Sequence, residues 1–387
     1  MTLTRCQVCG GTDLDLLYEM RSGLALTSLG ETYPASTRVW ACVDCSHLQT
    51  DEMEQVEQYY SEQYNILSDS EEEDQIYEVR DGKPLYRTEH QLRVLLDKLP
   101  LPAGARVLDY GCAKSSTMQA LLRVRGDLQV HLFDVSDNYR RFWERFLPEE
   151  RCATFEPQGQ WIDSFDLVTS FFALEHIVKP LDALQAIFRQ VRPGGHFYCV
   201  VPDVESNIAD FIVVDHVNHF TELSLAYLLQ QSGFEVEVID RSSHRGAFVV
   251  LARRPLSVLR QVKPEAERVA VQLQALRSIA AFWQGAVDRV TSFVAEQTPD
   301  RPLAVYGAGF YGSFLTACLG GADRISCFVD QNPFLQGRTL FGKPVVAPAD
   351  LSPLIDTLLV GLNPAHAERI IAEIPAFHSR ALRCFFL

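Results

Sequence analysis

The sequence predicts an α/β fold, in which a doubly wound parallel sheet follows a small cysteine-rich module and precedes a second, smaller α/β domain. Three observations predict this organisation. Apolar strand-like runs alternate with helical stretches in two regions, two Cys-x-x-Cys pairs precede both regions, and a helical segment separates them. Such alternation builds parallel sheets with helices on both faces. The expected parts are residues 1–60, 61–97, 98–254, 255–298 and 299–387.

The cysteine-rich module, residues 1–60, contains Cys6-Gln-Val-Cys9 and Cys42-Val-Asp-Cys45, with 32 residues between the pairs. Two Cys-x-x-Cys turns can bring four thiolates around one Zn²⁺ in tetrahedral geometry, whereas a redox pair needs only one such turn. Four cysteines leave no open coordination position. We therefore expect Cys6, Cys9, Cys42 and Cys45 to bind a structural zinc that contributes to folding rather than to catalysis.

The composition argues against several classes of protein. The 387 residues carry a formal net charge of −15, which argues against nucleic-acid binding because a phosphate-binding surface would be basic. No apolar run has the length of a membrane span, and the N-terminus lacks a signal-peptide pattern. Six of the ten cysteines are scattered singly, as in reducing compartments. We expect a cytoplasmic protein without a membrane partner, and the oligomeric state stays open.

Two segments are expected to connect the domains. Residues 61–97 are helical and acidic, and their run Asp69–Asp74 is expected to be a solvated loop. Residues 255–298 are expected to be helical, because apolar residues recur every three or four positions from Val269 to Val287.

The first α/β unit, residues 98–254, is expected to begin with a short apolar strand and a glycine turn. The expected elements are strands at Arg106–Asp109, Val130–Phe133, Phe165–Phe172 and His196–Val201, helices at Thr117–Arg125 and from Ala173–Ile177 onward, and a turn at Val191–Gly195.

The strand ends of this unit indicate what it binds. In an open α/β sheet, ligands lie across the carboxyl ends of the strands. Asp109 ends the first strand, Gly111 allows close backbone approach, and Asp134 follows the second strand, where an acid can hold ribose hydroxyls. The first turn lacks the Gly-x-Gly-x-x-Gly pattern that cradles a pyrophosphate. S-adenosylmethionine (SAM) therefore fits this turn better than NAD does.

The unit resembles the class I SAM-dependent methyltransferases. The resemblance rests on Val107–Cys112, Asp134, Phe165–Ile177 and Val191–Gly195. It implies a class I methyltransferase sheet that binds SAM. The residues implied in cofactor binding are Asp109, Gly111, Cys112, Asp134, Phe171, Phe172 and Ala173. The chain departs from the family where a second glycine is usual and this sequence has Ala113 and Lys114. An α/β domain that has lost its cofactor is the alternative.

Candidate catalytic residues follow the fourth strand of this unit. The segment Phe211–Ser224 contains His216 and His219, and Asp215 directly precedes His216. Methyl transfer to carbon requires removal of a proton beside a carbonyl, and a histidine oriented by an acid suits that task. We expect His216 to be the base, Asp215 to orient it, and His219 to be a reserve acid–base residue. The alternative is that both histidines only satisfy the hydrogen bonds of a loop.

The C-terminal unit, residues 299–387, contains a glycine motif after its first strand. Gly307-Ala-Gly-Phe-Tyr-Gly312 follows Leu303–Tyr306, and Asp330 follows the next strand, Ile325–Val329. This spacing is close to that of dinucleotide-binding domains, in which amides at a helix start bind phosphate. The motif can instead hold a nucleotide-sugar diphosphate, or serve only the close packing of helix against strand.

The whole arrangement resembles the three-domain sugar C-methyltransferase family, with an N-terminal zinc-binding module and a C-terminal Rossmann-like domain. The C-terminal part of the resemblance rests on Val305–Gly312 and Phe328–Gly337. It implies a nucleotide-linked 4-keto-deoxysugar as substrate, with Gly307, Gly309, Gly312 and Asp330 as binding residues. We also expect Asn218 to contact the substrate, because Asn218 and His219 lie within reach to donate to an enolate oxygen. The family's Tyr-His-Glu-His stretch reads Val213-Val214-Asp215-His216 here, so tyrosine-assisted proton transfer is not expected.

Two rival functions remain open at the level of sequence. An O- or N-methyltransferase on a sugar or another small metabolite would use the same scaffold. A non-catalytic, zinc-stabilised binding protein would follow if Ala113 and Lys114 marked a broken cofactor loop.

Overall fold

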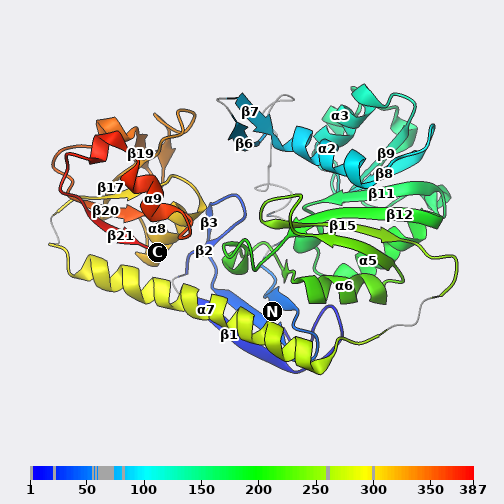
Figure 1. Cartoon of the computed structure of the whole chain (residues 1–387), viewed down its shortest axis with the longest axis horizontal. Helices are drawn as coiled ribbons and strands as arrows, with labels where there is room; N and C mark the ends of the chain where they lie inside the picture. The colour runs from blue at the N-terminus through cyan, green and yellow to red at the C-terminus, as the bar shows by residue number, and fades with distance from the viewer. Residues whose placement is uncertain are drawn as a thin grey trace.

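The protein is described here by a computed structural model, which covers residues 3–20, 23–54, 56, 59, 74–80, 83–258, 262–298 and 301–387. Two α/β domains lie at opposite ends of the molecule, the N-terminal module lies between them, and a long helix runs beneath that module (Figure 1). Most of the acidic run Asp69–Asp74 falls outside the described residues. Among the described residues, no helix is both long and apolar enough to cross a membrane.

The larger α/β domain is built on a seven-stranded sheet with the order β10-β9-β8-β11-β12-β15-β14. Its strands pair in parallel, except that β15 runs antiparallel to both of its neighbours. The chain order reverses between β8 and β11, which places the ligand-binding switch point there. The predicted doubly wound sheet is confirmed. Its strands are β8 (Arg106–Tyr110), β9 (Gln129–Asp134), β10 (Cys152–Thr154), β11 (Phe165–Phe171), β12 (Val191–Pro202), β14 (Glu235–Asp240) and β15 (Ala247–Arg253).

Helices cover both faces of this sheet, because its central strands carry apolar side chains on both faces. Val107 packs with α2, α3 and α4, whereas its neighbour Leu108 packs with α5 and α6. Pro180 starts α5, and Thr221 and Ser224 form a capping box at the start of α6. The helices are α2 (Arg87–Lys98), α3 (Ser116–Val124), α4 (Arg140–Trp143), α5 (Pro180–Gln190) and α6 (Glu222–Gln231), and the short 3₁₀ turns are η2 (Glu149–Arg151), η3 (Gly159–Trp161), η4 (Leu174–His176) and η5 (Asp210–Ile212).

The N-terminal module shares its sheet with the larger domain. β1 (Leu14–Met20), β4 (Thr37–Cys42) and β5 (Leu48–Thr50) are joined at the edge by β13 (Asn218–His219), which comes from the larger domain. β5 and β13 pair antiparallel. A hairpin of β2 (Ala25–Leu26) and β3 (Thr32–Tyr33) extends from the module between the two α/β domains (Figure 1). Two residues of the predicted catalytic segment, Asn218 and His219, therefore form the edge strand of the module's sheet.

The C-terminal domain is a second α/β unit with the strand order β18-β19-β17-β16-β20-β21. The helix α7 (Ala266–Ala295) precedes it and packs against β1 and α8, with Trp283 fully buried. The other elements are β16 (Leu303–Tyr306), α8 (Phe310–Cys318), β17 (Ile325–Val329), β18 (Thr339–Leu340), β19 (Lys343–Val346), η6 (Pro348–Asp350), β20 (Thr357–Val360), α9 (Ala367–Ala372), η7 (Pro375–Phe377) and β21 (Arg383–Phe386).

Three local predictions differ from the structure. Within the described part of the expected helical connector, residues 74–80 and 83–86 contain a hairpin of β6 (Ile76–Arg80) and β7 (Lys83–Tyr86), and α2 (Arg87–Lys98) follows it. The helix expected from Ala173 is the single turn η4, because Pro180 favours the first turn of the next helix. The expected turn at Val191–Gly195 belongs to β12, where an added Cβ on Gly195 would meet the Phe165 carbonyl at 2.9 Å.

Candidate active site and metal centre

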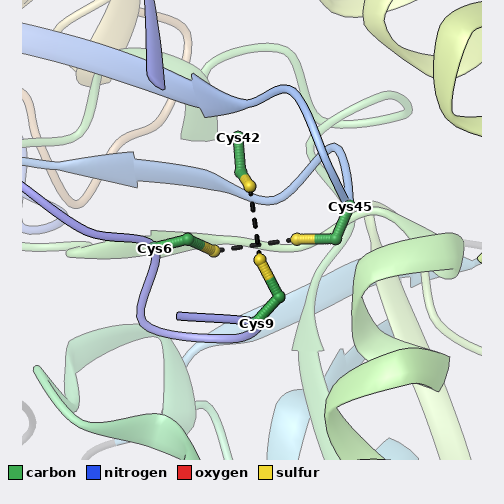
Figure 2. Close-up of side chains that lie close together, drawn as sticks. All are labelled: Cys6, Cys9, Cys42 and Cys45. Atoms are coloured by element: carbon green, nitrogen blue, oxygen red, sulfur yellow. Dashed lines mark hydrogen bonds between the residues drawn. The ribbon is translucent and has the colours of Figure 1, made fainter. Parts of the chain in front are cut away.

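The four cysteines predicted as metal ligands form one cluster in the N-terminal module. Their sulfur atoms lie within 4.8 Å of one another, with Cys6 and Cys45 at 3.7 Å and Cys9 and Cys42 at 3.4 Å (Figure 2). A tetrahedral zinc with Zn–S bonds of about 2.3 Å would place two sulfurs about 3.8 Å apart. The cluster therefore has the size of a tetrahedral zinc shell.

The surroundings of the cluster also fit a metal. The Val8 amide donates to Cys6 Sγ at 3.4 Å, and the Gly11 amide donates to Cys9 Sγ at 3.3 Å. Hydrogen bonds from neighbouring thiols lower the pKa of Cys9 and of Cys42, and the same bonds raise the pKa of Cys6 and of Cys45. A bound metal would instead take up four thiolates. Four cysteine ligands leave no position for substrate.

The side chain of Asp109 supports the loop that follows β8. This buried carboxylate accepts hydrogen bonds from Ser115 Oγ and Thr169 Oγ1, at 2.7 and 2.8 Å. Burial raises its pKa to about 6. Gly111 lies on the same loop with φ of +70°, and an added Cβ there would meet the Cβ of Ala173 at 2.8 Å. Asp109 therefore supports the loop, and Gly111 brings that loop against the end of β11.

Ala113 adopts the conformation that a glycine would take at this position. Its φ is +44°, in the left-handed region that costs energy for a residue with a Cβ. Two side chains hold it there: Asp134 Oδ2 accepts from the Ala113 amide at 2.8 Å, and Trp143 Nε1 donates to its carbonyl at 2.7 Å. The departure from the usual glycine thus leaves the loop in a glycine-like shape. Its neighbour Cys112 is buried.

The residues after β11 lie beside this loop. Phe172 has φ of +51°, and the Arg87 guanidinium lies 3.9 Å from its ring centroid. The Phe171 ring packs against Tyr198, with centroids 5.7 Å apart. Ala173 is the residue that faces Gly111. Non-glycine residues in left-handed conformations gather at functional sites, and three of them surround this loop: Ala113, Ser115 and Phe172.

The acid that orients His216 is Asp210, and the prediction of Asp215 for this role was wrong. His216 Nδ1 donates to Asp210 Oδ1 at 2.6 Å. The Asp215 carboxylate instead accepts from the Ser28 amide at 2.6 Å and from the Ser28 hydroxyl at 2.7 Å. The chain turns at 214–215, and this turn directs Asp215 to the loop between β2 and β3. Sequence adjacency suggested the wrong partner.

His219 and Asn218 are committed to contacts within the protein. His219 is fully buried, and its nitrogens contact Asp210 Oδ2 at 3.1 Å and Thr50 Oγ1 at 2.7 Å. The Asn218 amide donates to the carbonyls of Leu174 and Ile177, at 3.1 and 2.7 Å. These contacts occupy polar atoms of both side chains, and the roles of His219 in acid–base chemistry and of Asn218 in substrate binding stay predictions. Both side chains support the surroundings of His216 through these hydrogen bonds.

Sequence reasoning missed three residues of this site, which are Asp210, Glu175 and His176. The His176 and His216 rings lie 4.7 Å apart, and Glu175 Oε2 is buried without a hydrogen-bond partner. Ligand atoms of Glu175, His176 and His216 all lie within 4.8 Å of one another, so this group could also hold a metal ion. The available signal was the Glu-His pair directly after the predicted strand Phe165–Phe172.

The electrostatics of this group favour a charged His216. Burial alone would lower the pKa of His216, but the charge of Asp210 and the hydrogen bond to it, with the charges of Asp215 and Glu175, raise that pKa to about 9. Burial lowers the pKa of His176 to about 4, and His216 adds to this effect. Burial raises the pKa of Glu175 to about 7. These shifts favour the charged form of His216 over that of His176.

The C-terminal glycine motif is shaped by close packing. An added Cβ on Gly307 would meet the Gly361 carbonyl at 2.3 Å, and one on Gly312 would meet the Gly307 carbonyl at 2.0 Å. Gly309 has no neighbour within 4 Å of its Cβ position. Asp330 Oδ2 accepts from the Ala308 amide at 2.8 Å, which repeats the contact of Asp134 with Ala113. Packing explains Gly307 and Gly312, and Gly309 is free of that constraint.

Comparison with known proteins bears on the larger α/β domain. Residues 85–238 match the family model of a methyltransferase domain. This part of the chain has the class I methyltransferase fold. The match spans the loop after β8 and the segment with His216 and Asp210. It stops before β15 and leaves the cysteine-rich module and the C-terminal domain outside.

Curated relatives match the same domain. The chain is 32% identical over 132 residues to a ubiquinone biosynthesis O-methyltransferase of Pseudomonas fluorescens, covering 30% of this chain and 52% of the relative. A protein of the same name from Ralstonia nicotianae is 31% identical over 101 residues, covering 25% and 42% of the two chains. The chain spans about half the length of these relatives. A SAM-dependent methyltransferase from Mesorhizobium loti aligns at 19% identity, with a TM-score of 0.35, over 43% of this chain and 97% of that one.

Proposed function

We propose that the protein is a SAM-dependent C-methyltransferase that acts on a nucleotide-linked 4-keto-deoxysugar. The observation that carries this proposal is the pairing of His216 with the buried carboxylate of Asp210 on a methyltransferase domain. The choice of substrate is supported by the arrangement of the cysteine-rich module, the larger α/β domain and the C-terminal domain. The loop between β2 and β3 of the module contacts both α/β domains. Ser28 binds Asp215 on one side, and Gly30 lies against Phe310 on the other.

The residues of the first loop fit SAM. Gly111 removes a side chain where the loop meets Ala173, and Asp134 presents a carboxylate beside the loop at the end of β9. An acid in this position can accept from ribose hydroxyls. When bound, SAM supplies an electrophilic methyl group on a positively charged sulfur. In the same proposal, Cys6, Cys9, Cys42 and Cys45 hold a structural zinc.

His216 is proposed to act as the base through Nε2. Because Nδ1 donates to Asp210, a neutral His216 carries its lone pair on Nε2. That lone pair takes the proton from the carbon next to the ketone. The electrons of the broken C–H bond form a C=C bond, and the carbonyl electrons move to oxygen to give an enolate. The enolate carbon is the nucleophile that methylation at carbon requires.

The experiment is incubation of the protein with SAM and a panel of nucleotide-linked 4-ketosugars, with mass spectrometry for a gain of one methyl group. His216→Asn and His216→Ala should lose turnover while SAM still binds in calorimetry. Near-normal turnover in either variant would contradict the role of His216.

An O-methyltransferase is the second candidate, because the curated relatives of this domain are named ubiquinone biosynthesis O-methyltransferases. The two functions differ in the proton that His216 removes. Without SAM, C-methylation chemistry should exchange the proton on the substrate carbon with solvent deuterium. O-methylation chemistry would leave that carbon undeuterated.

A further inference from the structure

A continuous line of buried hydrogen bonds connects the four-cysteine module to His216. It runs from Thr50 Oγ1 to His219 Nε2 at 2.7 Å, from His219 Nδ1 to Asp210 Oδ2 at 3.1 Å, and from Asp210 Oδ1 to His216 Nδ1 at 2.6 Å. Thr50, His219 and Asp210 are at most 2% exposed. Water therefore has little access to replace any of these contacts.

The donors and acceptors in this line can be assigned from chemistry. An ionised carboxylate only accepts, so Asp210 takes a hydrogen from Nδ1 of both histidines. The pKa of Asp210 is lowered: burial opposes this, and the charge of His216 and the hydrogen bonds outweigh it. With a hydrogen on Nδ1, a neutral His219 has an acceptor at Nε2, and the Thr50 hydroxyl is the donor that it contacts. Thr50 thereby satisfies the acceptor of the His219 form that donates to Asp210.

Thr50 is itself fixed by the module. It ends β5, which begins three residues after Cys45. The Thr50 amide donates to the Val217 carbonyl at 3.2 Å, and β5 pairs with β13 at Gln49–Asn218 and Leu48–His219. His47 contacts the Asn218 side chain at 3.1 Å. The strand that leaves the cysteine cluster therefore holds both the backbone and the side chain of His219.

We infer that Thr50 is a positioning residue for His216, acting through His219 and Asp210, so that the cysteine-rich module takes part in orienting the base. This inference rests on the proposed function of His216. If the hydroxyl of Thr50 is lost, His219 Nε2 is buried without a donor. His219 keeps its hydrogen on Nδ1, because a carboxylate only accepts, but its ring loses one of the two hydrogen bonds that fix it. The ring can then tilt, which frees the Asp210 carboxylate to shift relative to His216.

The test is Thr50→Val, which keeps the shape of the side chain and removes its hydroxyl. Thr37→Val is the matched control, because Thr37 is a buried threonine of β4, and the side-chain partners of His219 among the described residues are Thr50 and Asp210. Thr50→Ser should restore the donor. With SAM and a nucleotide-linked 4-ketosugar, we expect kcat of Thr50→Val to fall by about 10- to 100-fold with little change in KM, since misplacing a catalytic group by about 1 Å costs about 100-fold.

The second measurement does not depend on turnover. The ¹⁵N resonance of His219 Nε2 should shift in Thr50→Val, because Nε2 loses the hydrogen bond from Thr50, and should stay at its wild-type position in Thr37→Val and Thr50→Ser. Wild-type kcat and unchanged ¹⁵N shifts in Thr50→Val would overturn the inference. Should Thr50→Val fail to fold, Thr50→Ala takes its place in both measurements. An active His216→Asn variant would instead overturn the proposed function, while the ¹⁵N result would still decide the role of Thr50.

Discussion

His216 Nδ1 lies 2.6 Å from the carboxylate of Asp210, which precedes it by six residues. This carboxylate is shared with His219, which lies three residues beyond His216. These two hydrogen bonds orient the imidazole ring of His216 and place a carboxylate beside it. They also place the pH dependence of the proposed reaction on Asp210.

Replacing Asp210 with Asn should shift the pH profile of kcat/KM to lower pH. In the wild type, the base must be neutral, so kcat/KM should rise with pH through the pKa of His216, about 9. The carboxylate raises that pKa, so its loss lowers the pKa and brings the rising limb down. The maximum rate should also fall, by about 100-fold, because the ring is no longer oriented.

Asp215→Asn is the matched comparison for this prediction. Its charge also raises the pKa of His216, but it makes its hydrogen bonds to Ser28. The limb should therefore move less than in Asp210→Asn. Equal shifts in the two variants, measured under the same ionic conditions, would show that Asp210 has no special role.

The parts of the fold that the sequence predicted are those with a strong local pattern. The strands β8, β9 and β11 are buried on both faces and appear in the sequence as short apolar runs. Glycine turns mark the ends of β8 and of β16, the first strand of the C-terminal domain. The cysteine spacing likewise predicted a cluster, because four sulfurs in two short turns have few other ways to be satisfied.

The site was predicted less well, because its contacts are not local. β13 has only two residues, too few to show any periodicity, and its pairing with β5 spans the chain from position 48 to 219. The choice between Asp210 and Asp215 depended on a turn and on Ser28, 187 residues away. A short segment between two acids does not reveal which of them a histidine will meet.

Gly111→Ala should destabilise the loop that follows β8. A Cβ there meets both a φ of +70° and the Cβ of Ala173 at 2.8 Å, so we expect a loss of about 1–3 kcal/mol in unfolding free energy. SAM affinity should fall with it. Gly104→Ala is the control, because Gly104 has φ of +73° and nothing within 4 Å of its Cβ position. If both variants lose the same stability and keep SAM affinity, the contact with Ala173 has no importance.

Ala113→Gly should leave SAM binding intact and stabilise the protein, or leave its stability unchanged. Relief of the left-handed strain at φ +44° gains about 1 kcal/mol, and the greater freedom of glycine in the unfolded chain offsets part of it. Ala247→Gly, in the buried strand β15, should instead lower the melting temperature. Loss of SAM binding in Ala113→Gly would mean that the methyl group of Ala113 itself shapes the site.

Removing the metal from the cysteine cluster should lower stability and slow the reaction together. Elemental analysis should find about one zinc per chain, because four cysteines form one closed shell. Cys6→Ser should abolish this zinc and lower the melting temperature, since metal binding contributes to folding. Cys327→Ser, at a buried cysteine of the C-terminal domain, should retain the zinc.

Because β5 leaves the cluster toward Thr50, the remaining folded Cys6→Ser protein should show reduced kcat. A zinc-free wild-type protein with the same melting temperature and kcat would contradict both expectations.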